Sequence, residues 1–279
     1  MTFERIRYEQ PASGVARIML ARSDKANAQD KAMLYEIDAA LSQAARDDAI
    51  RCIVIGADGK NFSLGHDLKD ESSLAEFPTV TQWAQFGDPG QAGQMNAEHE
   101  MYFGLCMRWR NLPKPTIVQV HGRCMAGGLM LVWPFDIVIA SDDAVFSDPT
   151  VGFGVNGIEY FAHVWELGHR KARELLFTGG DLSAEAARGL GMVNHIVPKP
   201  DLEAFTLAMA ERIAKRPMMG LRLAKLACNQ SLDAQGYSAA LGAAMGWQQL
   251  GHANARLLHG SPVDPAGARL IRDDLSGES

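Results

Sequence analysis

Two glycine-containing turns of this chain are candidates for binding an oxyanion, the negatively charged oxygen that forms when a carbonyl compound reacts. The first turn is residues 62–67 (FSLGHD), and the second is residues 126–128 (AGG), where an apolar helix is predicted to begin. Backbone N–H groups at a helix start lack partners within the helix, and the helix dipole favours negative charge there. Two such donors from separate turns can stabilise an oxyanion. We therefore predict the amides of Leu64 and Gly127 as the donors, with ordinary tight-turn packing as the alternative.

Buried strands are predicted to position these turns. Residues 51–56 (RCIVIG) form an apolar run, and residues 116–121 contain Ile117, Val118 and Val120, a β-branched series typical of a buried strand. Gly122 allows the chain to turn sharply after the second run. The glycines from 122 to 128 do not form a phosphate-binding loop, since no Gly-Lys-Ser/Thr follows them, and no G-x-G-x-x-G fingerprint is present.

The remaining pattern predicts an α/β fold. Residues 3–9 and 14–21 alternate as neighbouring strands, and residues 29–46 have apolar side chains at helical spacing. A similar order of strands and helices recurs around residues 136–147. Residues 69–97 are polar and rich in glycine and proline, so they are predicted to be a loop beside the substrate pocket or an exposed decoration.

The segments NFSLGHDL (61–68) and HGRCMAGGLMLVWPFDIVIA (121–140) together resemble the two signature segments of the crotonase (enoyl-CoA hydratase/isomerase) superfamily. The resemblance continues through DPTVGFG (148–154) and LFTGGDLSAEAARGLGMVNHIVP (176–198), in the expected order. It covers nearly all of residues 3–260. The resemblance implies binding of an acyl-CoA thioester and stabilisation of its enolate, with coenzyme A entering as part of the substrate and no separate cofactor.

The resemblance also implies how the chain is organised. A ββα superhelix with the coenzyme A and oxyanion site is expected over residues 1–198, a helical oligomerisation region over 199–260 and an irregular tail over 261–279. Members of the superfamily typically assemble as trimers, often paired into hexamers, so we expect a homotrimer or a dimer of trimers. The last long helix, predicted near 234–258, must bury its apolar side chains against its own core or a neighbouring subunit: Met245, Trp247 and Leu250.

Two positions depart from the pattern of the superfamily's hydratases. Those enzymes have one glutamate three residues after the oxyanion glycine and a second directly after the proline of a later Pro-Glu motif. Here the corresponding residues are Met130 and Thr150, which we expect in the substrate pocket. The enolate-binding scaffold is therefore expected without the pair of acids that activates water.

Glu159 is the main candidate for a catalytic base. It lies in residues 154–168, which replace a glycine-rich turn of the superfamily at a point where other members introduce acids. The apolar neighbours Ile158 and Phe161 would favour proton binding by its carboxylate. An electrostatic role at a helix start is the alternative. Tyr160 is expected in the substrate pocket, and His163 could contact either residue or serve only in packing.

His66 and Asp148 are the other candidate catalytic residues. A histidine at position 66 could donate to a carboxylate or carry a proton near neutral pH, or it could simply contact coenzyme A. Asp148 is a weaker candidate acid, because neighbouring turn residues face different ways. Asp67 is expected to cap the following helix and to order the loop near coenzyme A.

The segment Lys25-Ala26-Asn27-Ala28 resembles a shortened form of the part of the superfamily fold that lines the adenine pocket of coenzyme A. We expect contacts from its backbone, including that of Ala26, and from the amide of Leu64. Lys25 is a candidate phosphate contact.

Composition excludes several classes of protein. The chain has 279 residues, 47% of them apolar, with a net charge of −6. It has no basic stripe, so nucleic acid is not an expected partner. The sequence contains no run of 18 apolar residues, so no membrane span is predicted. The four cysteines are widely spaced with no CxxC pair, which favours reduced thiols and argues against a metal site. The first ten residues lack the apolar core of a signal peptide, so a cytoplasmic location is expected.

These observations predict an acyl-CoA lyase or isomerase. Isomerisation, decarboxylation or carbon–carbon hydrolysis, with Glu159 or His66 as base, is favoured over hydration. Two alternatives stay open: a non-catalytic protein that binds coenzyme A ligands, and a diketone hydrolase that uses no coenzyme A.

Overall fold

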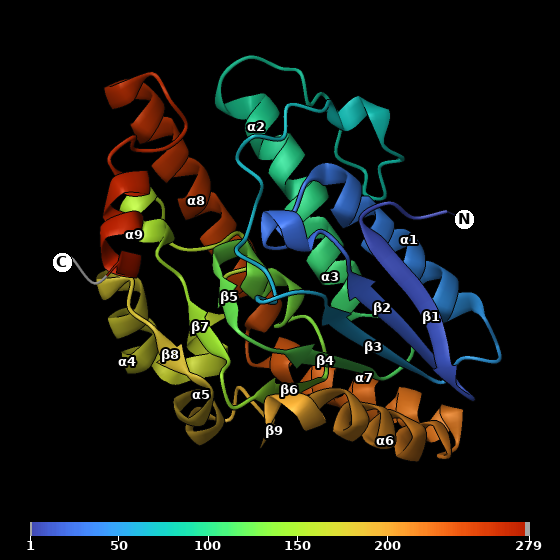
Figure 1. Ribbon diagram of the computed structural model, residues 1–279. Coiled ribbons are helices and arrows are strands. Elements are labelled where there is room, and N and C mark those ends of the chain that lie inside the picture. Colours follow the sequence, from blue (N-terminus) through green and yellow to red (C-terminus); the bar gives the residue numbers. More distant parts are fainter. Residues whose placement is uncertain (1, 277–279) are drawn as a thin grey trace.

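A twisted six-stranded sheet forms the centre of the computed structural model, which describes residues 2–276 (Figure 1). Its strand order is β1-β2-β3-β4-β6-β9, and only the β1–β2 pair is antiparallel. A smaller sheet has the order β5-β7-β8. The strands are β1 Ile6–Ala12, β2 Val15–Leu20, β3 Cys52–Ala57, β4 Thr116–Val120, β5 Arg123–Met125, β6 Ile137–Ser141, β7 Val145–Ser147, β8 Leu182–Ser183 and β9 His195–Val197.

The two faces of the large sheet pack against different helices, because successive side chains of a strand point to opposite faces. Ile53 and Ile55 of β3 belong to the main core, which also contains α1 (Lys31–Arg46) and α3 (Leu105–Arg110). Val54 of the same strand belongs to a second cluster with α6 (Leu202–Ala214). The buried strands predicted from β-branched runs are therefore confirmed, as is the helix predicted at residues 29–46.

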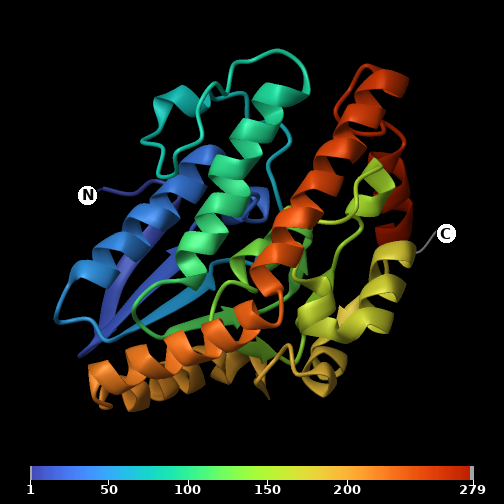
Figure 2. The same ribbon diagram turned by 180° about the vertical axis from the view of Figure 1, so that it is seen from behind.

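The prediction of a loop over residues 69–97 is partly wrong. Helix α2 begins within it and spans Gln91–Glu98, and it continues through a π-helical turn, His99–Gly104, into α3. Figure 2 shows this helical rod beside α8 (Tyr237–His259), and a 2.7 Å hydrogen bond from Gln249 Nε2 to Glu98 Oε2 joins the two. The helix was hidden in the sequence because the side chains that it buries are polar, and polar side chains do not give the usual apolar periodicity.

The tail predicted as irregular contains a helix, α9 (Gly267–Ser276). It packs against the turn at residues 150–153, and a side chain at position 267 would come within 2.6 Å of the Gly152 carbonyl oxygen. This long-range contact cannot be read from the tail alone. The other helices are α4 His163–Thr178, α5 Ala184–Leu190 and α7 Met218–Ala234, and α7 lies in the region 199–260 that was predicted to be helical.

The apolar side chains of α8 divide between the core and the surface. Met245 is fully buried within the chain's own fold, whereas Trp247 is 64% exposed and Leu250 is 59% exposed. Met219 and Leu223 of α7 are exposed as well. Within residues 2–276 no helix is long and apolar enough to cross a membrane.

Candidate active site

The two glycine turns lie side by side. They follow β3 and β4, which are parallel neighbours, with the short strand β5 between β4 and the second turn. The turns then pair with each other: the amide of Phe62 donates to Arg123 O at 3.0 Å, and the amide of Met125 donates to Ser63 O at 2.9 Å. The buried Gln29 side chain ties them further, since its Nε2 donates to Gly127 O at 2.8 Å.

The two predicted oxyanion donors differ in their surroundings. Ala126 has a φ of 49°, a left-handed conformation, and it starts a short 3₁₀ helix that ends at Leu131. Gly127 is the second residue of this helix, so its N–H precedes the first hydrogen bond within the helix. The amide of Leu64, in contrast, already donates to Ala26 O at 3.2 Å. Gly127 is therefore the better-prepared donor.

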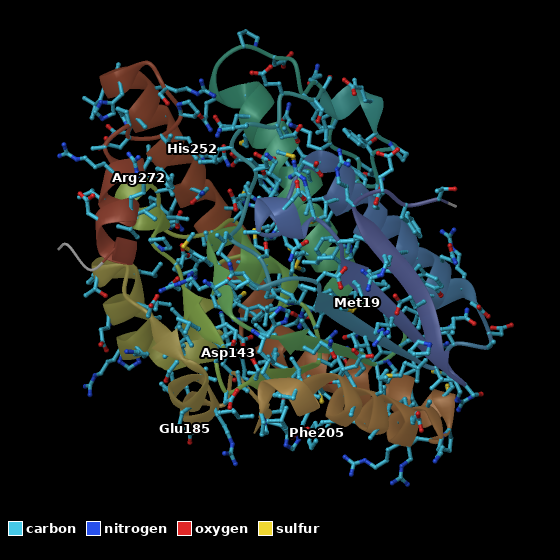
Figure 3. All side chains as sticks on the ribbon, viewed as in Figure 1. Met19, Asp143, Glu185, Phe205, His252 and Arg272 are labelled. Atoms are coloured by element: carbon cyan, nitrogen blue, oxygen red, sulfur yellow. The ribbon has the colours of Figure 1, made fainter. Side chains whose placement is uncertain are left out.

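One cavity, of about 660 Å³, joins these turns to distant parts of the chain. Leu64, His66 and Asp67 line it from the first turn and Ala126 from the second, with Thr150 and Glu159 beside them. The remaining wall comes from α2, α8 and α9, and Figure 3 labels two of its side chains, His252 on α8 and Arg272 on α9. Another cavity, of about 710 Å³, is lined by α1, α3 and the π-helical turn, but none of the predicted site residues lies in it.

Glu159 and His66 meet within the first cavity. Glu159 Oε2 lies 3.2 Å from His66 Nε2. The imidazole stacks on Tyr102 with 4.0 Å between ring centroids, and it also lies against Gly127, where a Cβ atom would come within 2.6 Å of its Cε1. His66 Nδ1 is buried without a hydrogen-bond partner. Gly127 thus leaves room for the histidine ring, which a side chain at this position would meet.

A second acid in the cavity, Glu98, escaped the sequence analysis. Its Oε1 accepts a hydrogen bond from Gln94 Nε2 and its Oε2 accepts one from Gln249 Nε2, both at 2.7 Å. The cavity also brings together one side-chain oxygen or nitrogen atom from each of three residues, all within 4.8 Å of one another: Glu98, Glu159 and His252. Burial and the negative charge of Glu159 raise the pKa of Glu98, and His252 and the two glutamine amides offset only part of this.

His252 was also missed. Its Nδ1 lies 2.6 Å from Pro262 O, and because a carbonyl oxygen can only accept, Nδ1 carries a proton. Its Nε2 lies 3.3 Å from Glu98 Oε1 but makes no hydrogen bond. The available signal was a group of polar residues within an otherwise apolar helix, Gln248, Gln249 and His252.

The structure does not bring Asp148 to the cavity. Asp148 Oδ1 accepts from the amide and hydroxyl of Thr150 at 3.1 and 2.6 Å, and Oδ2 accepts from the Ile158 amide at 3.0 Å and from His163 Nε2 at 2.7 Å. Burial alone would raise the pKa of Asp148, but these bonds, led by that to His163, hold it below its ordinary value. Its surroundings are those of a carboxylate that fixes the turn.

Other predicted residues also lie apart from the cavity. Met130 and Tyr160 are buried in the main core, and the Tyr160 hydroxyl accepts a hydrogen bond from that of Tyr237 at 2.9 Å. Lys25 is exposed and lines no part of the cavity. Asp67, in contrast, lines the cavity, but it caps a turn rather than the predicted helix, since it accepts from the amide of Lys69 at 3.0 Å.

Comparisons with known proteins agree with this architecture. The sequence model of the family described as enoyl-CoA hydratase/isomerase matches residues 10–255, and the chain belongs to this family. A Mycobacterium tuberculosis protein named "Putative enoyl-CoA hydratase EchA13" is 43% identical over 263 residues, which are 90% of this chain and 82% of that protein.

Solved structures show the same fold. A crystal structure of "a probable ENOYL-COA Hydratase" from Mycobacterium smegmatis has a TM-score of 0.85 and 44% identity, covering 93% of this chain and 99% of that one. An enoyl-CoA hydratase/isomerase from Xanthobacter autotrophicus Py2 has a TM-score of 0.82 and 30% identity, covering 100% and 98%. The superfamily and the fold class predicted from the sequence are confirmed.

Replacing Asp148 with asparagine should destabilise the fold. Removing one partner of a buried ion pair typically costs about 3 kcal/mol or more, and urea denaturation would measure this loss in the free energy of unfolding. The exposed Arg123–Asp181 pair is a matched control, and Asp181→Asn should cost less than about 1 kcal/mol.

The effect of Asp148→Asn should also depend on pH. Because folding lowers the pKa of Asp148, its stabilisation is fully present above its unfolded pKa of about 3.9 and is lost as the pH falls below that value. The difference between the wild type and Asp148→Asn should therefore shrink in acid. An equal urea midpoint for the two proteins at pH 7 would contradict the structural role.

Proposed function

We propose that this chain binds an acyl-CoA thioester and removes a proton from the carbon next to the carbonyl group. Glu159 is the base, and the amide of Gly127 is the first donor to the enolate oxygen. The observation that carries this proposal is the contact series from Glu159 through His66 to Gly127. It holds a buried carboxylate near an oxyanion donor, as deprotonation next to a thioester requires.

The second donor has two candidates. The amide of Leu64 can serve if the thioester oxygen displaces Ala26 O, with which it now shares a 3.2 Å hydrogen bond. His66 Nδ1, which has no partner, is the alternative when the imidazole is protonated. One oxyanion donor typically contributes roughly 3 kcal/mol to lowering the barrier.

Coenzyme A needs cations and backbone donors beside the cavity. Lys31 and Arg272 line it, and they are candidates for contacts with the phosphate groups. We also propose contacts with coenzyme A from the backbone of Ala26, whose carbonyl oxygen accepts a hydrogen bond from the Leu64 amide, and from Asp67, which lines the cavity. Lys25 could contribute only from the exposed rim.

Among reactions that pass through an enolate, we favour isomerisation of the acyl double bond over hydration, with decarboxylation or carbon–carbon hydrolysis next. Thr150 lines the cavity but its hydroxyl is too weak a base to activate water, and Met130 is buried in the core. If coenzyme A thioesters bind but no product forms, a non-catalytic binding protein is favoured. Hydrolysis of a diketone without binding of coenzyme A would favour a diketone hydrolase that uses no coenzyme A.

Glu159→Gln keeps size and hydrogen bonding but removes the base. On an accepted substrate it should lower kcat at least about a hundredfold while KM changes only a few fold. His66→Asn should have a smaller effect. Glu185→Gln is the control, since Glu185 is exposed on α5, far from His252 (Figure 3). Near-full kcat in Glu159→Gln would remove Glu159 as the base.

Hydration of crotonyl-CoA should be very slow. Without acids at positions 130 and 150, the rate should be at least about a hundredfold below that of a family hydratase with both glutamates, assayed in parallel by product chromatography. A comparable rate for the two proteins would show that other groups activate water.

The exposed apolar residues of α7 and α8 favour assembly into a homotrimer or a dimer of trimers. Light scattering should give a mass three or six times the 30.3 kDa of one chain. Trp247→Glu should shift the mass downward, because a charge would be buried in the interface. A stable monomer of the wild type at micromolar concentration would contradict this assembly.

A further inference from the structure

The hydrogen bonds to Glu98 distinguish it from a residue that only packs in the core. It comes from α2, its two carboxyl oxygens each accept from a glutamine amide, and it lines the cavity that contains Glu159. Only 5% of the residue is exposed to solvent. The two amides are neutral, so they orient the carboxyl group without neutralising it, and His252 Nε2 lies 3.3 Å from Oε1 without a hydrogen bond.

The neighbourhood of Glu98 favours one shared proton rather than two negative charges. Like charges this close disfavour double ionisation, and the pKa of Glu98 is raised by burial and by Glu159. The other titratable and charged side chains that line the cavity, besides Glu98, Glu159 and His252, are Lys31, His66, Asp67, Asp70, Tyr102 and Arg272. Glu98 therefore favours its protonated form, while Glu159 Oε2 lies 3.2 Å from His66 Nε2.

We propose that Glu98 is a second catalytic acid, which delivers a proton to a different carbon from the one that Glu159 deprotonates. Gln94, Gln249 and His252 are its positioning residues. This inference rests on the proposed function, and it narrows the reaction to double-bond isomerisation with a separate base and acid. The substrate class is then a 3-enoyl thioester of coenzyme A.

The two steps balance without any other reactant. Glu159 takes the proton from C2 of the 3-enoyl thioester, and the electron pair of the broken C–H bond moves into the conjugated enolate. The enolate then takes the proton of Glu98 at C4, which leaves a double bond between C2 and C3. Glu159 is now neutral and Glu98 is charged, and a proton passing from Glu159 to Glu98 restores both.

The test separates removal of the first proton from delivery of the second. In deuterium oxide, exchange at C2 of butyryl-CoA needs only the base, whereas conversion of 3-hexenoyl-CoA to 2-hexenoyl-CoA needs both groups. Mass spectrometry measures the first reaction and proton NMR the second. Glu98→Gln should keep exchange within a few fold of the wild type and lower isomerisation at least about a hundredfold. Glu159→Gln should lose both.

Glu166→Gln is the matched control, since burial raises the pKa of Glu166 to about 7 and yet it lies outside this cavity. It should leave both reactions unchanged. Wild-type isomerisation in Glu98→Gln would overturn the inference while leaving the proposed function intact. A wild-type protein that neither exchanges butyryl-CoA nor isomerises 3-hexenoyl-CoA would overturn the proposed function itself.

A second variant keeps the inference testable if Glu98→Gln does not fold. His252→Gln leaves both acids in place but removes the imidazole beside Glu98. It should lower kcat for isomerisation roughly tenfold or more while KM and C2 exchange stay within a few fold, because misplacing a reacting group slows only the step that uses it. Parallel losses of exchange and isomerisation would instead indicate general damage to the site.

Glu98, Glu159 and His252 could also hold a divalent cation, because one ligand atom of each residue lies within 4.8 Å of the other two. Removal of metal with EDTA should therefore leave isomerisation unchanged if Glu98 carries a proton. Loss of isomerisation in EDTA and its return with Zn²⁺ would overturn the role of Glu98 as an acid and make it a metal ligand.

Discussion

The parallel pairing of β3 with β4 is the constraint on which the rest of the site depends. Parallel neighbours have their carboxyl ends at the same edge of the sheet, so the turns that follow them must meet there. The hydrogen bonds between residues 62–63 and 123–125 extend this pairing into the turns themselves. The Gly127 amide and the His66 imidazole are thus held by the sheet, whereas Glu98 and His252 reach the same cavity from helices α2 and α8.

Two buried carboxyl groups show how surroundings separate structural from chemical roles. Asp148 receives four hydrogen bonds, one of them from a histidine, and its pKa is lowered. Glu98 receives two hydrogen bonds from neutral amides, lies close to a second carboxylate, and has a raised pKa. The first group is fixed as an anion, which suits a structural anchor. The second favours its protonated form, which suits a proton donor and makes it a poor base for activating water.

The sequence predicted those parts of the site that local pattern and family resemblance determine. The strands, the helix at residues 29–46 and the two turns follow from β-branched runs, apolar periodicity and glycine placement. Glu159 and His66 were recognised because they stand where the family pattern changes. Glu98 could not be found in this way, since its significance depends on α8 lying beside α2, a contact between residues about 150 positions apart. The same holds for α9, whose packing partner is the turn at residues 150–153.

The position of His66 links the missing hydratase glutamates to the acids that are present. Its ring fills the space above Gly127 and, through Nε2, holds Glu159 in the cavity. A glutamate at position 130 would have to leave the main core to reach this cavity, and Thr150 offers only a hydroxyl. The glutamates that line this cavity come instead from α2 and from the segment before α4. In the proposed reaction, a thioester whose oxygen binds the Gly127 amide places its acyl chain alongside Glu98 and Glu159, so that a proton leaves one carbon and another arrives two carbons further along the chain.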